Sequence, residues 1–166
     1  DAVAFSASGD VNDFTVTYSV ELDGADTTTG GVDNYSIAMD FGDAGVLRFD
    51  GHGGSTFLSG NDDVMPTASE EPWDVITGAD TGVINGHSGN NAWRYDYSHE
   101  SGLNLTLTYI NATNAVNDVS YSDYGITYTG MEGVTVGYGQ GDVEVTTGTQ
   151  SDESTLFATY AIGGAT

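Results

Sequence analysis

The stretch Phe14-Thr-Val-Thr-Tyr-Ser-Val-Glu-Leu22 decides the fold class of this chain. Its apolar side chains are Phe14, Val16, Tyr18, Val20 and Leu22, and the polar side chains between them are Thr15, Thr17, Ser19 and Glu21. Successive side chains of a β-strand point to opposite faces of a sheet. The alternation therefore predicts a strand with one apolar and one wet face.

The same alternation recurs along the chain and predicts nine strands. They are expected at residues 2–8, 14–22, 34–41, 46–51, 92–100, 103–111, 120–129, 134–141 and 154–162. The 24 glycines, many beside Asp, Asn or Ser, and the ten tyrosines are typical of a β-rich chain with many turns. The sequence thus predicts an all-β protein, with residues 1–166 forming one domain.

The connections between the predicted strands alternate in length. They run short, long, short, very long, short, medium, short and long along the chain. In an up-and-down meander alternate connections lie at the same end of the sheet, so the short turns would share one rim. That segregation is typical of bacterial outer-membrane barrels, whereas the Greek-key crossovers of a β-sandwich break it. Since tilted strands of about nine to eleven residues cross a bilayer, we expect an antiparallel up-and-down transmembrane β-barrel.

The longest connection, residues 51–91, has neither a helical nor a two-residue period. It contains both prolines of the chain and six carboxylates. These carboxylates are Asp62, Asp63, Glu70, Glu71, Asp74 and Asp80. Loops of this length inside a compact domain usually carry function when they are ordered.

Composition excludes several classes of partner. The chain has 25 acidic residues against two arginines and no lysine, a net charge of −23. Nucleic acid is excluded because nothing would neutralise its phosphates, while cations would accumulate around such a chain. Without cysteine there is no disulfide, thiolate metal site or cysteine nucleophile. No window approaches roughly eighteen consecutive apolar residues, so a transmembrane helix is not expected.

The chain resembles the general-diffusion porins of Gram-negative outer membranes, particularly those of alphaproteobacterial and marine type. The resemblance is carried by residues 14–22 and 34–51, by the paired stretches 93–97 and 103–109, by 124–128 and 134–138, and by 157–160. The loop stretch Asp62-Asp-Val-Met-Pro-Thr-Ala-Ser-Glu-Glu71 is similar to the third loop of such proteins.

This resemblance implies a sixteen-stranded barrel in the outer membrane, usually a homotrimer, whose third loop folds inward and narrows the pore. The nine strands would match roughly the second to the tenth. Nine strands cannot close an even-numbered barrel, and Thr166 replaces the terminal aromatic residue typical of these proteins. We therefore interpret residues 1–166 as an internal portion of a longer porin, with any targeting segment removed or not included.

A pore constriction selects by size and charge. The six loop carboxylates would form a negative wall, and the two cations, Arg48 and Arg94, fall on the polar faces of the strands that flank the loop. Opposite charges facing each other would set a transverse field, with selectivity for cations and small neutral solutes. In the alternative interpretation the loop acids are solvated, and the arginines pair locally with Asp50 and Asp96.

Clustered acids also suggest calcium, since hard cations take several carboxylate and carbonyl oxygens. Asn61-Asp62-Asp63 or Glu70-Glu71 would supply them, although EF-hand spacing is absent and a halophilic surface is the simpler explanation. No other cofactor is expected. His52, His87 and His99 share no metal-ligand spacing, and no nucleophile motif is present, so an enzyme is not expected. The rival to a porin is a secreted acidic β-sandwich, a calcium-dependent adhesin or surface-layer module.

Overall fold

A computed structural model describes residues 2–23, 31–61, 91–111, 119–145 and 151–161. These residues form the strands β1 (Ala2–Val11), β2 (Phe14–Asp23), β3 (Val32–Asp40), β4 (Val46–His52), β5 (Ala92–Ser98), β6 (Leu103–Ile110), β7 (Val119–Met131), β8 (Val134–Val145) and β9 (Ser151–Tyr160). Two short 3₁₀ turns, η1 (Gly42–Ala44) and η2 (Ser59–Asn61), complete the elements. The prediction of an all-β chain is confirmed.

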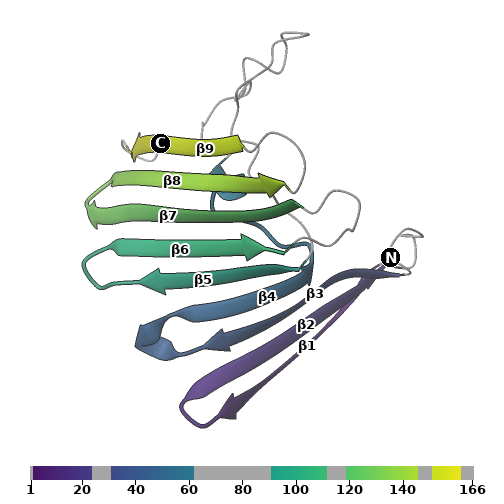
Figure 1. Ribbon diagram of the computed structural model, residues 1–166. Helices are drawn as coiled ribbons and strands as arrows, with labels where there is room; N and C mark the ends of the chain where they lie inside the picture. The colour runs from purple at the N-terminus through teal and green to yellow at the C-terminus, as the bar shows by residue number, and fades with distance from the viewer. Residues whose placement is uncertain (1, 24–30, 62–90, 112–118, 146–150, 162–166) are drawn as a thin grey trace.

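The nine strands form a single sheet in the order β1-β2-β3-β4-β5-β6-β7-β8-β9, and every neighbouring pair is antiparallel. The predicted up-and-down meander is therefore confirmed. The sheet is open, because β1 and β9 each pair on one side only within the described residues. Figure 1 shows the four tight connections on one rim, at the left of the view.

The described residues build one layer and not the two packed layers that a β-sandwich requires. The register places side chains of cross-strand partners on the same face. One face of the sheet collects the larger apolar side chains, among them Val3, Phe5, Val16, Tyr18, Val20, Ile37, Met39, Leu47, Phe49, Trp93, Tyr95, Tyr97, Leu105, Leu107, Tyr124, Ile126, Val136, Tyr138, Leu156 and Tyr160. We call this the apolar face and the other the polar face.

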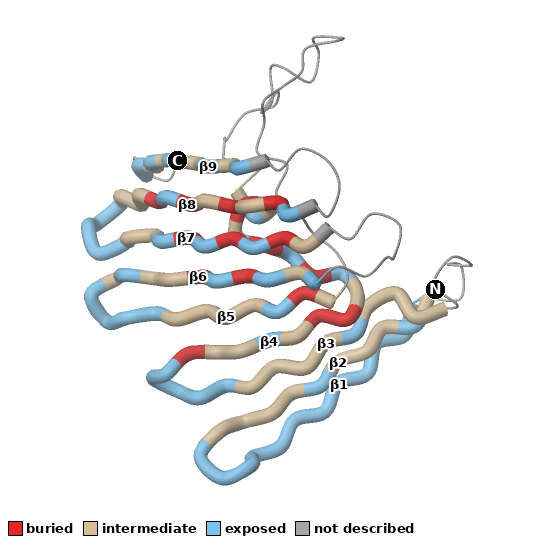
Figure 2. The backbone as a smooth tube through the Cα atoms, viewed as in Figure 1, coloured by how far each residue is buried: buried red, intermediate tan, exposed pale blue. Residues whose placement is uncertain are grey.

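Burial is the reverse of what a water-soluble sheet shows. On β7 the polar-face residues Tyr121 and Asp123 are buried, whereas Tyr124 and Ile126 of the apolar face are 37% and 41% exposed. Phe5 at one end of the sheet is 58% exposed and Leu156 at the other 82%. Figure 2 shows this alternation of buried and exposed residues along β7 and β8.

Several strand ends differ from the prediction. β1 continues to Val11, because Gly9, Asp10 and Val11 find partners on β2, so the expected connector 9–13 shrinks to Asn12 and Asp13. Asn12 has φ 55, a conformation that asparagine tolerates better than most residues.

Pairing with the neighbouring strand also decides where other strands begin and end. β8 reaches Val145, since β7 is long enough to pair with it, and β9 runs from Ser151 to Tyr160 instead of residues 154–162. β5 stops at Ser98. The expectation that residues 51–91 hold no regular element is wrong in its described part, since β4 includes His52 and η2 follows.

Candidate functional site

The described start of the long loop, residues 53–61, lies across the polar face, and we call it the crossing segment. It leaves β4, meets Arg94 of β5 through Ser55, and reaches β7 and β8 through Phe57 and Leu58. It therefore lies on the same side of the sheet as both arginines.

The crossing segment has its own hydrogen bonds. The Thr56 N–H donates to Ser59 Oγ at 2.9 Å, and the Ser59 N–H donates back to Thr56 Oγ1 at 3.1 Å. The Asn61 side-chain amide donates to the Phe57 carbonyl at 2.8 Å. These bonds close η2 into a compact turn that presents Phe57 and Leu58 to the sheet.

Glycines on β7 and β8 make room for this turn. A Cβ atom at Gly125 or Gly139 would overlap the Phe57 ring, and one at Gly141 would lie 2.7 Å from a Leu58 methyl carbon. Glycine inside a strand often marks a close approach of another part of the chain. The three glycines thus form a shallow socket in the polar face.

Asp123 fixes the turn in the socket. Its Oδ2 accepts a hydrogen bond from the Leu58 N–H at 2.9 Å and one from the Tyr121 hydroxyl at 3.3 Å. The Tyr121 hydroxyl also hydrogen-bonds the Thr56 side chain. Asp123 is only 5% exposed and Leu58 is fully buried, so a carboxylate sits beneath the crossing segment.

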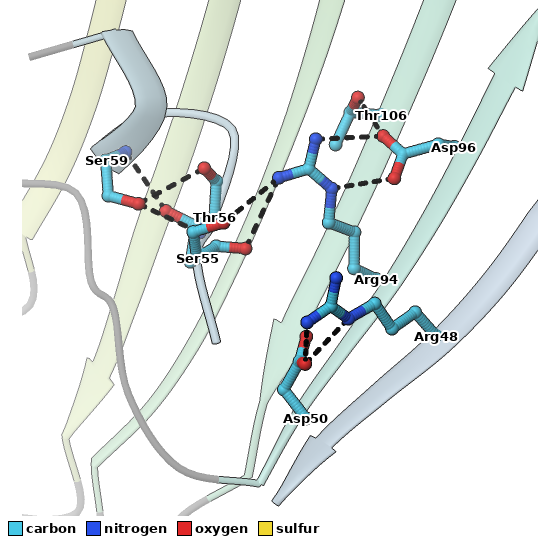
Figure 3. Close-up of polar contacts among 8 residues, drawn as sticks. All are labelled: Arg48, Asp50, Ser55, Thr56, Ser59, Arg94, Asp96 and Thr106. Carbon is cyan, nitrogen blue, oxygen red and sulfur yellow. Dashed lines mark hydrogen bonds and ion pairs between the residues drawn. The ribbon is translucent and has the colours of Figure 1, made fainter. Parts of the chain in front are cut away.

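The arginines lie beside each other on neighbouring strands, as Arg48 of β4 is the direct cross-strand partner of Arg94 of β5. Their expected position on the polar face is confirmed. Figure 3 shows each guanidinium turned to a carboxylate two residues further along its own strand. Arg48 pairs with Asp50 at 2.6 Å, and Arg94 donates to both Asp96 oxygens, at 2.7 and 3.0 Å.

This local pairing is the one that the alternative interpretation expected. Asp96 also accepts a hydrogen bond from the Thr106 hydroxyl at 2.7 Å, while the second terminal nitrogen of Arg94 reaches Ser55 of the crossing segment at 3.4 Å. Arg94 therefore links the sheet to the loop. Near Arg48 a hollow of about 270 Å³ opens on the polar face, and Ser6, Ser19, Glu21 and Ser36 line it.

The carboxylates predicted to line a constriction, Asp62, Asp63, Glu70, Glu71, Asp74 and Asp80, lie outside the described residues. So do both predicted calcium groups apart from Asn61, whose amide is bonded to Phe57. Within the described ranges no three His, Cys, Asp or Glu side chains come together as a metal site.

The histidines take separate places. His52 contacts the Asp33 carbonyl through its ring Nδ1, and His99 lies in the turn after β5, where it meets Ser101. The prediction that His99 lies on a strand is wrong, because β5 ends one residue earlier. His87 lies outside the described residues.

Sequence reasoning missed the socket and its anchor, Asp123. A signal was present: Gly137, Gly139 and Gly141 alternate with larger residues on β8, which leaves the polar face of the middle of that strand without side chains. Gly137 is covered by the Phe157 ring of β9, and the other two lie under the crossing segment.

No protein-family model matches the chain, and no curated protein is significantly similar to it. Among the described residues, none of the helical turns has the length and apolar character needed to span a membrane. Geometry and chemistry alone therefore carry the functional argument.

Proposed function

We propose that this chain forms part of the wall of an outer-membrane porin, through which small hydrophilic solutes and cations diffuse passively. The observation that carries the proposal is the inverted burial of the sheet. Aromatic and aliphatic side chains stay exposed on one face across the strands, while buried residues gather on the polar face.

The apolar face suits contact with lipid. Exposed apolar patches on soluble monomers rarely exceed a few hundred Å², yet this face runs from Phe5 on β1 to Leu156 on β9. In hydrocarbon these side chains incur no hydration cost, and strand backbone groups are satisfied by their neighbours in the sheet. Six of the nine strands have nine or more residues, the length that a tilted crossing needs, whereas β4, β5 and β6 have seven or eight.

The polar face suits a water-filled lumen. Its exposed or half-exposed positions carry Ser, Thr, Asn, Glu and the two arginines. The crossing segment also lies on this face, where it contacts Asp123 and Arg94. With a net charge of −23, a lumen bounded by this chain would concentrate cations.

The open edges support a larger assembly. Strands at the edge of a sheet present unpaired N–H and C=O groups, which are not tolerated in lipid. β1 and β9 are such edges within the described residues. We propose that further strands close a barrel of about sixteen strands in all, that three copies assemble, and that the protein is neither an enzyme nor dependent on a cofactor.

The test is fractionation followed by conductance. The gene, expressed with its natural leader, should yield protein in the outer-membrane fraction, and the purified protein should add discrete conductance steps to planar bilayers with a cation-selective reversal potential. A water-soluble monomer that needs no detergent would contradict the proposal.

A loop variant then tests selectivity separately. Changing Asp62, Asp63, Glu70 and Glu71 together to their amides should lower the cation preference while leaving conductance steps intact. An unchanged reversal potential would remove this loop from the selectivity argument but not the pore itself.

A further inference from the structure

Three buried oxygen atoms on the polar face have no hydrogen-bond partner among the described residues. They are Asp123 Oδ1 on β7, Thr108 Oγ1 on β6 and Glu153 Oε2 on β9. Thr108 is 4% exposed and Asp123 is 5% exposed. Buried polar atoms are nearly always satisfied in folded proteins, so each of these atoms calls for a partner that the described residues do not supply.

The register brings these three residues into one row. Thr108 pairs with Asp123, Asp123 pairs with Gly141, and Gly141 pairs with Glu153. Because cross-strand partners share a face, all side chains of the row project from the polar face. Gly141 contributes no side chain, and the Tyr121 hydroxyl and a Leu58 methyl group occupy the space above it.

The Tyr121 hydroxyl leans over that glycine. A Cβ at Gly141 would overlap it, and it interacts electrostatically with the carboxylates of both Asp123 and Glu153. Tyr121 donates its proton to Asp123 Oδ2. A hydroxyl has a single hydrogen to give, so Asp123 Oδ1 and Glu153 Oε2 stay without a donor among the described residues.

No cationic side chain balances the pair of carboxylates in the described structure. The chain has no lysine, and its two arginines are bound to Asp50 and Asp96. His52 and His99 are bonded elsewhere. Burying carboxylates without a counter-charge is costly, and proteins meet that cost by pairing the charge or by coordinating a metal ion.

We infer that Asp123 and Glu153 bind a hard, oxygen-preferring cation, for which Ca²⁺ is the fitting probe. Thr108 is three strands away from Glu153, too far for both residues to hold one ion. Ca²⁺ accepts carboxylate and neutral oxygen ligands in flexible geometry and fills its remaining positions with water. The site lies on strands, apart from the loop groups that the sequence suggests, and it does not depend on the pore proposal. Because Asp123 also holds the Leu58 N–H, the cation secures the crossing segment on the sheet.

Thermal unfolding of the purified protein tests the inference, with Ca²⁺ compared against EDTA at matched ionic strength. A ligand that binds only the folded state raises the melting temperature in a saturable way. We expect such a rise in the unaltered protein and its loss, with Ca²⁺ affinity falling about tenfold or more, in Glu153→Gln.

Asp152→Asn is the matched control. Asp152 is the neighbour of Glu153 on β9 but projects from the apolar face, where it pairs with Asp142. This variant removes one negative charge from the same strand, so it measures how far general attraction of Ca²⁺ to an acidic protein accounts for the effect. It should keep the saturable stabilisation.

A second readout uses Tb³⁺ in place of Ca²⁺. Excitation through a nearby tyrosine makes bound Tb³⁺ luminesce, and the Tyr121 ring lies at the site. Competition by Ca²⁺ should remove this signal in the unaltered protein, and Tyr121→Phe and Glu153→Gln should lower it. Equal stabilisation by Ca²⁺ in the unaltered protein, Glu153→Gln and Asp152→Asn, or no stabilisation at all, would overturn the inference.

Discussion

Asp123 Oδ2 accepts a hydrogen bond from the Leu58 backbone N–H at 2.9 Å, across a sequence separation of 65 residues. This contact ties the crossing segment, which follows β4, to β7 on the polar face. It is a buried bond between a carboxylate and a main-chain donor, a pairing that is stronger than a bond between neutral groups. It therefore fixes where the crossing segment lies on the sheet.

Asp123→Ala should destabilise the protein, because the buried Leu58 N–H would lose its acceptor. An unsatisfied buried donor costs about 1–3 kcal/mol. Asp123→Asn keeps an acceptor oxygen and should cost less. Denaturant unfolding in detergent with EDTA present, so that a bound cation does not contribute, measures the difference, and equal losses in both variants would argue against the bond.

Gly139→Ala should also destabilise, since the new methyl group would overlap the Phe57 ring. Overpacking of this kind costs about 1–3 kcal/mol. Gly9→Ala on β1 is the control, because a Cβ there meets no atom within 4 Å. Unfolding midpoints of the two variants provide the comparison.

A double variant then separates contact from strand propensity. Phe57→Ala removes the ring that the methyl group would strike, so Gly139→Ala should cost much less in that background, and the difference is a coupling energy. If Gly139→Ala costs the same with and without the Phe57 ring, the socket does not hold the crossing segment.

The strands and their order could be predicted because both depend on short-range information. Alternation such as that of Phe14–Leu22 is local, and tight turns join consecutive strands as antiparallel neighbours. Strand ends could not be predicted as well, because a partner decides them: Gly9 and Asp10 have turn-like composition, yet they pair with Val16 and Thr15.

Part of the candidate site could likewise be predicted from local sequence, and part could not. Arg48 and Arg94 could be placed on the polar face because successive side chains of a strand alternate between its two faces. The same alternation puts Asp50 and Asp96, two positions further on, beside them for the ion pairs. The contact between Leu58 and Asp123 could not be predicted in this way, because it depends on how the crossing segment passes over β5 and β6 to reach β7. Only the alternating glycines of β8 pointed to it.

Arg94→Gln should make the proposed pore more cation-selective. The substitution removes a positive charge from the polar face and frees Asp96, which is 41% exposed, from its ion pair. We expect the cation-to-anion permeability ratio to rise about twofold or more. Arg94→Lys keeps the charge and should leave the ratio near its original value. Reversal potentials in a salt gradient measure both, and equal values for Gln and Lys would place Arg94 away from the ion path.

Tyr18 and Ser19 are neighbours in the middle of β2 and project from opposite faces of the sheet. A single arginine substitution at each position therefore tests whether that face contacts lipid or water. Tyr18 is 46% exposed. If the apolar face contacts lipid, Tyr18→Arg should make folding into phospholipid vesicles less favourable by about 2–4 kcal/mol, the cost of an arginine near the bilayer midplane. Ser19→Arg, on the lumen side, should cost far less.

In water the same pair of variants gives a different result. An arginine replacing an already exposed tyrosine changes the stability of a soluble protein by only about 0.5 kcal/mol, so the two variants would then behave alike. The folded fraction in vesicles, followed by the fluorescence of the tryptophans and by heat-dependent migration on gels, distinguishes these cases. A cost confined to Tyr18→Arg and measured in vesicles ties the apolar face to hydrocarbon, because a water-exposed face accepts the charge at both positions.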